Sequence, residues 1–473
     1  MQTPLTRKDA LKLGAAAGVA FSATGLLPRA AKAAPVGLGS KPSILLILVD
    51  DMPDRLLEVM EQVRTRIMAP GTRFVNAYTA IPLCGPNRAA ILTGMFPHTS
   101  AVKTNSAWSE FSNRGHNPFT FVKALNDSGY ETALCGKLMN GHPLGHVPAG
   151  WDYFYELSGS ATHNATGFDV AENGRVFHYQ ATANDSELAF EKARAWIEAR
   201  QPATQPFFIQ FSPTNPHNPY TPIANHSWDG VPIRVAPSVN EADVSDKPAK
   251  MRKNLQDPAQ LQRSEEGMRE ELEDTDRQVA GLVAAAEQIT GNSNLLIIFT
   301  SDNGFQTGEH RLMNKSWPYQ ESIEIPLIMR ATNLPAQQEP TQLVSSVDIS
   351  ATILKFAGVA PPRGLDGRSL HQIVMGTQPA SWRKRVLIEN PVDRYWQMYR
   401  EFQPAAGKDF AYIKHLASTT DPNPGSEFYD LNLTADPYQL NSKPSRITAD
   451  MRDKLRRLTT LKGRYLREVE VEA

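Results

Sequence analysis

The chain has 473 residues, of which 41% are hydrophobic and 21% are charged. These proportions are those of an ordinary globular protein, so they exclude a disordered chain and allow one large domain with a smaller one. The formal net charge is −1, and like charges form no long block. The composition therefore gives no electrostatic basis for a nucleic acid or an anionic membrane surface as partner.

The first 34 residues have the pattern of an export signal. Arg7 and Lys8 precede a weakly apolar run that ends at Leu27, and Ala31-Lys32-Ala33 is similar to a cleavage site. "TRKDALKL" resembles a twin-arginine signal with a lysine as the second basic residue; a general secretory signal is the alternative. Because no later run reaches about 18 apolar residues, we expect a secreted or periplasmic protein with no membrane span in its mature form.

Three apolar runs end in polar residues. "SILLILVDD" ends in Asp50 and Asp51, "FFIQFS" is followed by "PTNPHNP" with His217, and "NLLIIFTSDNG" contains Asp302 and Asn303. Runs that are apolar on both faces are typical of central strands in a parallel sheet covered by helices. Ligands of such sheets bind beyond the carboxyl ends of the strands, so the three endings predict a single active site.

The surrounding sequence alternates predicted helices and strands. "FVKALNDSGYETALCGK" indicates a helix, a glycine-containing turn and a strand. Residues 237–277 are polar, charged and poor in aromatic side chains, which predicts a surface excursion that leads into a helix over Arg263–Gln288. Strands that alternate with helices indicate a layered α/β domain.

The pattern changes after "PPRGLDGRSL" (361–370), a linker rich in proline and glycine. "VLIEN", "FAYIKHL" and "SEFYDL" are predicted short strands, and a closing helix is expected over Ile447–Glu470. We therefore predict a signal peptide at residues 1–34, a catalytic domain at 35–370 and a C-terminal subdomain at 371–473.

The residues at two of the strand ends have the chemistry of a metal site. Asp50 and Asp51 follow one strand, and Asp302 and Asn303 follow another. Hard oxygen donors of this kind are the ligands that Ca²⁺ or Mg²⁺ requires, whereas zinc would need more His or Cys. The pairs therefore predict a calcium or magnesium site.

Cys84 begins the turn in "PLCGPNRAAILTG" and is one of only two cysteines. Further cations and imidazoles that could surround an anion are Arg88, Lys137, His217, His310 and Lys315. Backbone N–H groups at the start of the predicted helix would add donors. A metal, cations and one nucleophile suit transfer of a sulfuryl or phosphoryl group; a disulfide between Cys84 and Cys135 is the structural alternative.

These motifs resemble those of the type I sulfatases, whose signature is C-x-P-S-R followed by four residues and T-G. "LVDD", "GK", "PHNP", "SDNGF", "GEH" and "NKSWPYQESIEIPL" agree in order, over roughly residues 41–466. "NEADVSDKP" and "YDLNLTADPYQLN" are similar to stretches of the N-acetylglucosamine-6-sulfatase and extracellular endosulfatase branch. The resemblance implies an alkaline phosphatase-like α/β fold, with a large mixed, mostly parallel sheet between helices and a small C-terminal antiparallel sheet plus helix.

The resemblance also implies a cofactor and a role for each site residue. A formylglycine-generating enzyme would convert Cys84 to formylglycine (3-oxoalanine) before export, and its hydrate would be the nucleophile. The implied ligands of Ca²⁺, with Mg²⁺ less expected, are Asp50, Asp51, Asp302, Asn303 and the modified Cys84. The implied anion-binding and proton-transfer residues are Arg88 on the formylglycine, Lys137 and Lys315 on sulfate oxygens, His217 as the acid for the leaving alcohol, and His310 near the substrate.

Two positions depart from the commonest family pattern. Asn87 stands where the family usually has Ser, sometimes Ala or Thr. Met139 stands where many sulfatases have the His of G-K-W-H, although the N-acetylglucosamine-6-sulfatase branch reads G-K-Y-L-N. His142 or His146 could then be the base that assists expulsion of sulfate.

The predicted function is hydrolysis of sulfate esters, on an aryl ester or a sulfated sugar such as 6-O-sulfated N-acetylglucosamine in a glycosaminoglycan. One alternative keeps the fold and gives a phosphonate monoester or phosphodiester hydrolase. Another is a non-catalytic binder of sulfated carbohydrate, if Cys84 is unmodified. Substrate specificity is expected in the loops at residues 105–117, 142–167 and 218–236.

Overall fold

The computed structural model describes residues 41–157, 167–180, 184–200, 205–222, 228, 230–232, 236–291, 294–331, 334–419, 421–432 and 434–472. The predicted signal peptide lies outside the described residues, as do parts of two of the loops in which we expect specificity.

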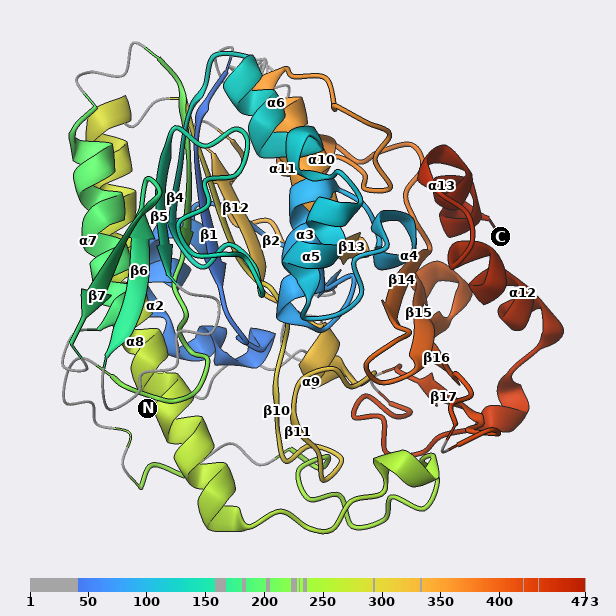
Figure 1. The fold of residues 1–473 in the computed structure, drawn as a ribbon. Coiled ribbons are helices and arrows are strands. Elements are labelled where there is room, and N and C mark those ends of the chain that lie inside the picture. Colours follow the sequence, from blue (N-terminus) through green and yellow to red (C-terminus); the bar gives the residue numbers. More distant parts are fainter. Residues whose placement is uncertain are drawn as a thin grey trace, which may run out of the picture.

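A nine-stranded mixed sheet forms the centre of the molecule (Figure 1). Its five central strands run parallel, and the strands at both edges run antiparallel to their neighbours. In spatial order the strands are β2 (Thr72–Arg73), β12 (Leu327–Ala331), β9 (Leu295–Ser301), β1 (Ser43–Val49), β8 (Phe207–Ser212), β4 (Glu131–Gly136), β5 (Tyr153–Leu157), β6 (Phe168–Glu172) and β7 (Arg175–Tyr179). The three predicted strands with polar endings are β8, β1 and β9, which are direct neighbours.

Helices cover both faces of this sheet, as the doubly apolar strands predict (Figure 1). One face packs against α7 (Asp185–Glu198) and α8 (Pro258–Thr290), and the short α2 (Glu61–Val63) lies beside α8. The other face packs against α3 (Cys84–Thr93), α5 (Ala107–Asn113), α6 (Phe121–Asp127), α10 (Asp348–Ala357) and α11 (His371–Val374). Along β1, Leu45, Ile47 and Val49 enter the first core, and Ile44, Leu46 and Leu48 enter the second.

Helix α8 corrects one prediction. The polar stretch 237–277 was expected to be a surface excursion with a helix from Arg263, but the helix begins at Pro258, and Asp257 caps it by accepting a hydrogen bond from the backbone N–H of Ala259. Glu265 is buried within it because the Arg55 guanidinium donates to both of its carboxylate oxygens, at 2.5 and 2.7 Å. Charges that neutralise each other inside the protein have the same sequence signature as a solvated surface.

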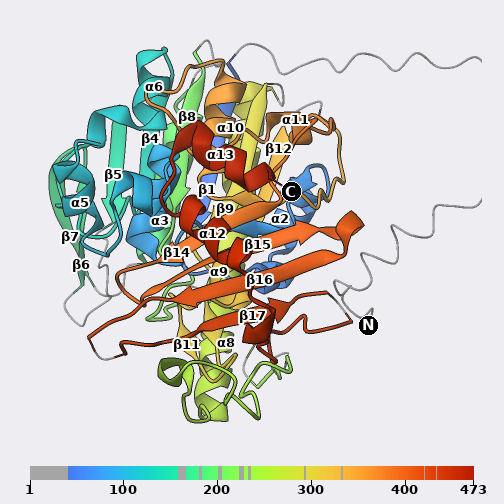
Figure 2. The same cartoon turned by 90° about the vertical axis from the view of Figure 1, so that its right-hand side faces the viewer.

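A second, four-stranded antiparallel sheet follows the large one in the chain and is here called the C-terminal sheet (Figure 2). It consists of β14 (Arg385–Asn390), β15 (Trp396–Gln403), β16 (Lys408–His415) and β17 (Ser426–Asp430). The sequence predicted three of these strands but not β15. The predicted closing helix is divided into α12 (Ala449–Leu458) and α13 (Gly463–Val471), with a turn at residues 459–460 between them.

Apolar side chains from both faces of the C-terminal sheet join it to the rest of the protein. Val386 and Ile388 on β14 share a core with Tyr78 and Trp317, and Leu387 shares another with residues of α3, α12 and α13. Short elements complete this region: α4 (Pro97–Ser100), α9 (Gln320–Ile323), β3 (Ala77–Tyr78), β13 (Val344–Ser345), β10 (Gln306–Thr307) and β11 (Met313–Asn314). The predicted fold class is confirmed, whereas the proposed domain boundary at residue 370 stays a prediction.

Candidate active site

The carboxyl ends of β1 and β9 bring two acidic pairs together. The two strands are paired in parallel with Val49 opposite Ser301, so the residues that follow them are neighbours. The backbone N–H of Asp51 donates to Asp302 Oδ1 at 3.1 Å, and Asn303 Nδ2 donates to Asp51 Oδ1 at 2.7 Å. Asp51 has φ of 63°, which turns the chain sharply after the strand.

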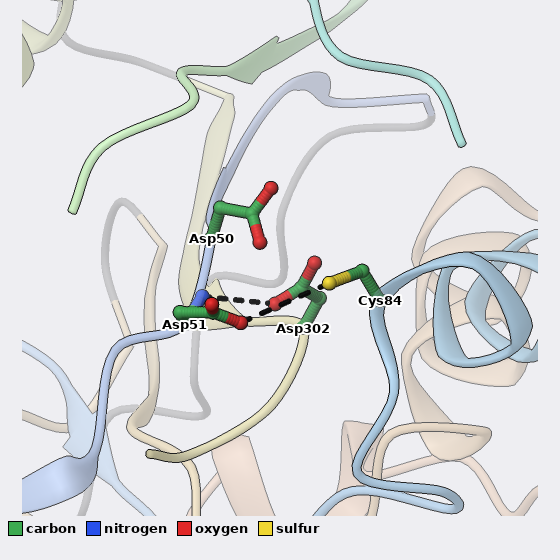
Figure 3. A group of neighbouring side chains, drawn as sticks. All are labelled: Asp50, Asp51, Cys84 and Asp302. Carbon is green, nitrogen blue, oxygen red and sulfur yellow. Dashed lines mark hydrogen bonds between the residues drawn. The ribbon is translucent and has the colours of Figure 1, made fainter. Parts of the chain in front are cut away.

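Cys84 faces these carboxylates from the first residue of α3 (Figure 3). Its Sγ lies 3.8 Å from Asp51 Oδ1, and one ligand atom from each of Asp50, Asp51, Cys84 and Asp302 lies within 4.8 Å of the others. All four residues are buried. Cys84 and Cys135 are both free, so the disulfide alternative is wrong.

The chemistry of this cluster fits a divalent cation. Among the described residues, no hydrogen-bond donor reaches Asp50 Oδ1 or Asn303 Oδ1, although both oxygens are buried. Buried oxygens without donors are costly unless a cation binds them. Because the ligand atoms are mostly oxygens from carboxylates and an amide, they fit Ca²⁺ or Mg²⁺ better than a soft metal.

Three fixed cations surround the carboxylates. Arg88 donates from Nε to Asp302 Oδ2 at 2.7 Å and from Nη1 to the carbonyl oxygen of Lys137 at 2.8 Å. The Lys137 ammonium forms a short ion pair with Asp50. Lys315 Nζ lies 2.6 and 2.7 Å from the two oxygens of Asp51 and 2.7 Å from Cys84 Sγ. Lys315 thus bridges Cys84 and the carboxylate of Asp51.

These charges determine which carboxylates are ionised. Burial on its own would raise the pKa of Asp50, but Lys137 and Arg88 outweigh it and hold that pKa well below the ordinary value. Burial and the neighbouring Asp50 raise the pKa of Asp302. For Lys137, burial opposes the charge, yet Asp50 keeps the pKa of the ammonium above its ordinary value. The cluster is therefore a compensated group of charges, in which a bound anion and a metal would replace existing partners.

The two predicted active-site histidines have different surroundings. His217 lies in the loop after β8, is partly exposed, and places Nε2 3.7 Å from Asp51 Oδ2. His310 is fully buried; its Nδ1 is 2.7 Å from Glu241 Oε2, and its Nε2 is 3.8 Å from Glu321 Oε2. The structure therefore brings His217 to the cluster, whereas the one side-chain hydrogen bond of His310 among the described residues runs to Glu241.

His142 and His146, the candidates for a base, form a group of their own. His142 Nδ1 lies 2.5 Å from Glu156 Oε1, and its Nε2 lies 3.2 Å from His146 Nδ1. Burial lowers the pKa of His142 to about 4 and raises that of Glu156 to about 9. The described hydrogen bonds of this group do not reach the Cys84 cluster.

Asn87, the departure from the usual signature, has a defined structural role. Its Oδ1 accepts hydrogen bonds from the backbone N–H of Ala80, at 3.2 Å, and from Ser346 Oγ, at 2.6 Å. Its Nδ2 donates to the carbonyl oxygen of Asp302 at 2.5 Å. The side chain thus joins the helix that begins at Cys84 to the turn that carries Asp302. The sequence marked Asn87 as unusual, but no local signal pointed to Ser346, which is distant in the chain.

Comparisons with known proteins define the class of this protein. Residues 42–359 match the family model described as Sulfatase, and residues 308–460 match the one described as N-sulphoglucosamine sulphohydrolase, C-terminal. The first match covers more than half of the chain, so the chain belongs to the sulfatase family. It is an enzyme that hydrolyses sulfate esters.

Named relatives agree with this family. The chain is 28% identical over 465 residues to the N-acetylglucosamine-6-sulfatase of Capra hircus, covering 88% of this chain and 82% of that protein. It is 26% identical to the N-acetylglucosamine-6-O-sulfatase of Bacteroides thetaiotaomicron, covering 85% and 82%. The extracellular sulfatase SULF-1 homolog of Drosophila melanogaster is 27% identical over 74% of this chain and 33% of that protein.

Solved structures share the fold. One, in complex with its substrate D-glucosamine-2-N,6-O-disulfate, matches with a TM-score of 0.68 at 23% identity over 89% of this chain and 97% of that one. A phosphonate monoester hydrolase from Silicibacter pomeroyi matches with a TM-score of 0.66 at 16% identity, over 89% and 94%. At these identities the likeness concerns the fold alone. Among the described residues, no helix combines the length and apolar character needed to cross a bilayer.

Proposed function

We propose that this sulfatase is exported, binds Ca²⁺, uses formylglycine formed from Cys84, and removes sulfate from 6-O-sulfated N-acetylglucosamine or a related sulfated sugar. The observation that carries the proposal is the meeting of Cys84 with three buried carboxylates and Lys315 at the ends of β1 and β9. Because Cys84 is only 1% exposed in the folded chain, a formylglycine-generating enzyme would act before folding and export.

We assign a separate role in the reaction to each group of residues around the cluster. Formylglycine hydrate would supply the attacking hydroxyl, and Ca²⁺ held by Asp50, Asp51, Asp302 and Asn303 would supply positive charge beside it. Lys137 and Lys315 would bind sulfate oxygens and stabilise the charge that grows on them during transfer. Arg88 holds Asp302 and the backbone of Lys137, and so keeps ligand and lysine in one arrangement.

His217 is proposed as the general acid. Its ring is partly exposed, and its Nε2 lies 3.7 Å from Asp51 Oδ2. In its protonated form it would donate a proton to the alcohol oxygen as the S–O bond breaks. His310 is proposed as a further active-site residue near the substrate only on the resemblance of "GEH", because its buried side chain is paired with Glu241.

The substrate class rests on the relatives. Two of those compared are named for removal of the 6-sulfate of N-acetylglucosamine, and "NEADVSDKP" and "YDLNLTADPYQLN" are similar to that branch. The name of the Drosophila melanogaster relative supports an extracellular location. Export is proposed on the signal-like pattern of residues 1–34.

Mass measurement of the tryptic peptide that carries residue 84 tests the nucleophile. We expect the loss of mass that accompanies conversion of cysteine to the aldehyde, and more conversion after co-expression with a formylglycine-generating enzyme. A peptide that always carries the thiol would contradict the proposed mechanism and favour a non-catalytic binder.

Parallel assays with an aryl sulfate, an aryl phosphonate and a panel of sulfated monosaccharides test the reaction and the substrate. We expect turnover of sulfate esters, with 6-O-sulfated N-acetylglucosamine preferred over 2-O- and 4-O-sulfated sugars. A large excess of phosphonate turnover would favour the phosphonate monoester hydrolase instead.

A further inference from the structure

The segment that carries Lys315 has an unusual backbone. Between β10 and Trp317, four residues other than glycine have positive φ, namely His310 (56°), Arg311 (60°), Asn314 (69°) and Ser316 (78°). A positive φ is unfavourable for a residue with a Cβ atom and persists only where its surroundings enforce it. Two of the four flank Lys315 directly, so contacts from outside the segment must hold the lysine in place.

The contact that holds Ser316 comes from the C-terminal sheet. The indole Nε1–H of Trp396, on β15, donates to the carbonyl oxygen of Ser316 at 2.9 Å. Asn390, paired with Trp396 across β14 and β15, places Nδ2 3.5 Å from the same oxygen. Ser316 Oγ in turn donates to the carbonyl oxygen of Pro82 at 3.3 Å, two residues before Cys84.

This arrangement matters because Lys315 has a long and flexible side chain. Holding such a side chain in one geometry costs rotamer entropy, so a fixed backbone at Lys315 helps to keep its ammonium at the site. Its Nζ nevertheless contacts both Asp51 oxygens and Cys84 Sγ. A rotation at Ser316 would carry Nζ away from both residues.

We propose that Trp396 is a positioning residue for Lys315. Its N–H keeps Ser316 in the left-handed conformation, and this conformation places the Lys315 ammonium where the sulfate group is held. The inference rests on the proposed function, in which Lys315 binds sulfate oxygens. It gives the C-terminal sheet a part in catalysis although Trp396 itself touches no reacting atom.

The chain offers a matched control for a merely structural role. Trp382 also donates its indole N–H to a backbone carbonyl, that of Leu343, at 2.8 Å. Among the described residues, no hydrogen bond links Leu343 to the Lys315 segment. Trp382→Phe and Trp396→Phe therefore remove the same donor and keep an aromatic ring, but only the second affects Lys315.

Kinetics with an aryl sulfate, inhibition by inorganic sulfate and thermal unfolding are measured for both variants. Loss of one hydrogen-bond donor in a catalytic site lowers rates by up to about 10²–10³-fold. For Trp396→Phe, which acts indirectly, we expect kcat/KM to fall about 10- to 100-fold and inhibition by sulfate to weaken about tenfold. For Trp382→Phe we expect kcat/KM within about twofold of the wild type and a change in Tm similar to that of Trp396→Phe. Equal kinetics in the two variants would overturn the positioning role.

A double-variant comparison makes the link to Lys315 explicit. Because Trp396 acts through Lys315, adding Trp396→Phe to Lys315→Ala should cause no further loss of kcat/KM. Full additivity of the two losses would overturn the proposal. Ser316→Gly tolerates positive φ and should restore part of the activity of Trp396→Phe.

Ser316→Thr replaces this test if Trp396→Phe does not fold. The variant keeps the hydroxyl but places a β-branched residue at a φ of 78°, so it should reproduce the loss of kcat/KM. Wild-type kinetics in Ser316→Thr would overturn the proposal. A wild-type chain that hydrolyses no sulfate ester would instead contradict the proposed function.

Discussion

Cys84 and Cys135 are both buried and both free, yet their surroundings differ in kind. Cys84 lies beyond the strand ends, where Asp51 and Lys315 contact its sulfur. Cys135 lies within β4, in the apolar core between the sheet and helices α7 and α8. Burial raises the pKa of both thiols. Rarity and burial therefore do not distinguish the two cysteines; only Cys84 has charged side chains in contact with its sulfur among the described residues.

Replacing Cys84 is the strongest way to break this comparison. We expect Cys84→Ala to lower kcat by about 10⁴-fold or more, because the nucleophile is lost. Aryl sulfate turnover measures the loss, and an unchanged Tm shows that the fold survives. A variant that keeps a tenth of wild-type activity would show that residue 84 is not the nucleophile.

Treatment with a chelator tests whether the cluster of Asp50, Asp51, Cys84 and Asp302 binds a metal ion. Dialysis against a calcium chelator should abolish turnover and lower Tm by several degrees, because a ligand that binds only the folded state stabilises it. Added Ca²⁺ should restore both quantities, and Asp302→Ala should lose both permanently. Activity and Tm that are unaffected by the chelator would contradict a metal at the Asp50 cluster.

Glu156 sharpens the comparison because it is a carboxyl buried without a fixed cation. Burial raises its pKa to about 9, whereas Lys137 and Arg88 hold the pKa of Asp50 low. A carboxyl whose folded pKa is raised stabilises the protein at low pH and loses that contribution as pH rises toward the folded pKa. Burial lowers the pKa of His142, so its titration makes the stability of the protein rise with pH, but only below about pH 6.5.

The wild type should therefore lose stability between about pH 6.5 and 9, and Glu156→Gln should flatten this decline by on the order of 3 kcal/mol. Denaturant unfolding at several pH values measures the slope. Glu265→Gln is the matched control: Arg55 keeps the pKa of Glu265 below its ordinary value, so this variant should be destabilised at pH 7. Parallel pH profiles for the wild type and Glu156→Gln would contradict a neutral Glu156.

Replacing Cys135 should have the smallest effect. Cys135→Ala removes a buried sulfur from an apolar core, which should cost about 1–2 kcal/mol of unfolding free energy. We expect kcat/KM within about twofold of the wild type, measured beside Cys84→Ala. A folded but inactive Cys135→Ala would mean that this region also serves the reaction.

Much of the site was predictable because its residues directly follow predicted strands in the sequence. A strand that is apolar on both faces must be central, and a polar residue directly after it must lie at the carboxyl edge. Asp50, Asp51, Asp302 and Asn303 are all of this kind. Their adjacency follows from the pairing of β1 with β9. Both strands were predicted as central strands because both are apolar on both faces.

Other features could not be predicted because the residues that interact are distant from each other in the sequence. Glu265 lies in the polar stretch 237–277 but is buried beside Arg55. Strand β15, which carries Trp396, was not predicted. The hydrogen bonds of His310 to Glu241 and of Asn87 to Ser346 join residues 69 and 259 positions apart. No local pattern carries such pairs.

The sequence by itself indicated the class of chemistry, because a cysteine motif, pairs of hard oxygen donors and cations follow recognisable turns and strands. Only the tertiary structure decided how the charges are matched: Lys137 with Asp50, Arg88 with Asp302, and Lys315 with both Asp51 and Cys84. The physical reason is that ion pairing depends on distances of a few ångströms. Such distances arise when separate strands and the C-terminal sheet pack together, and they leave no trace in local sequence.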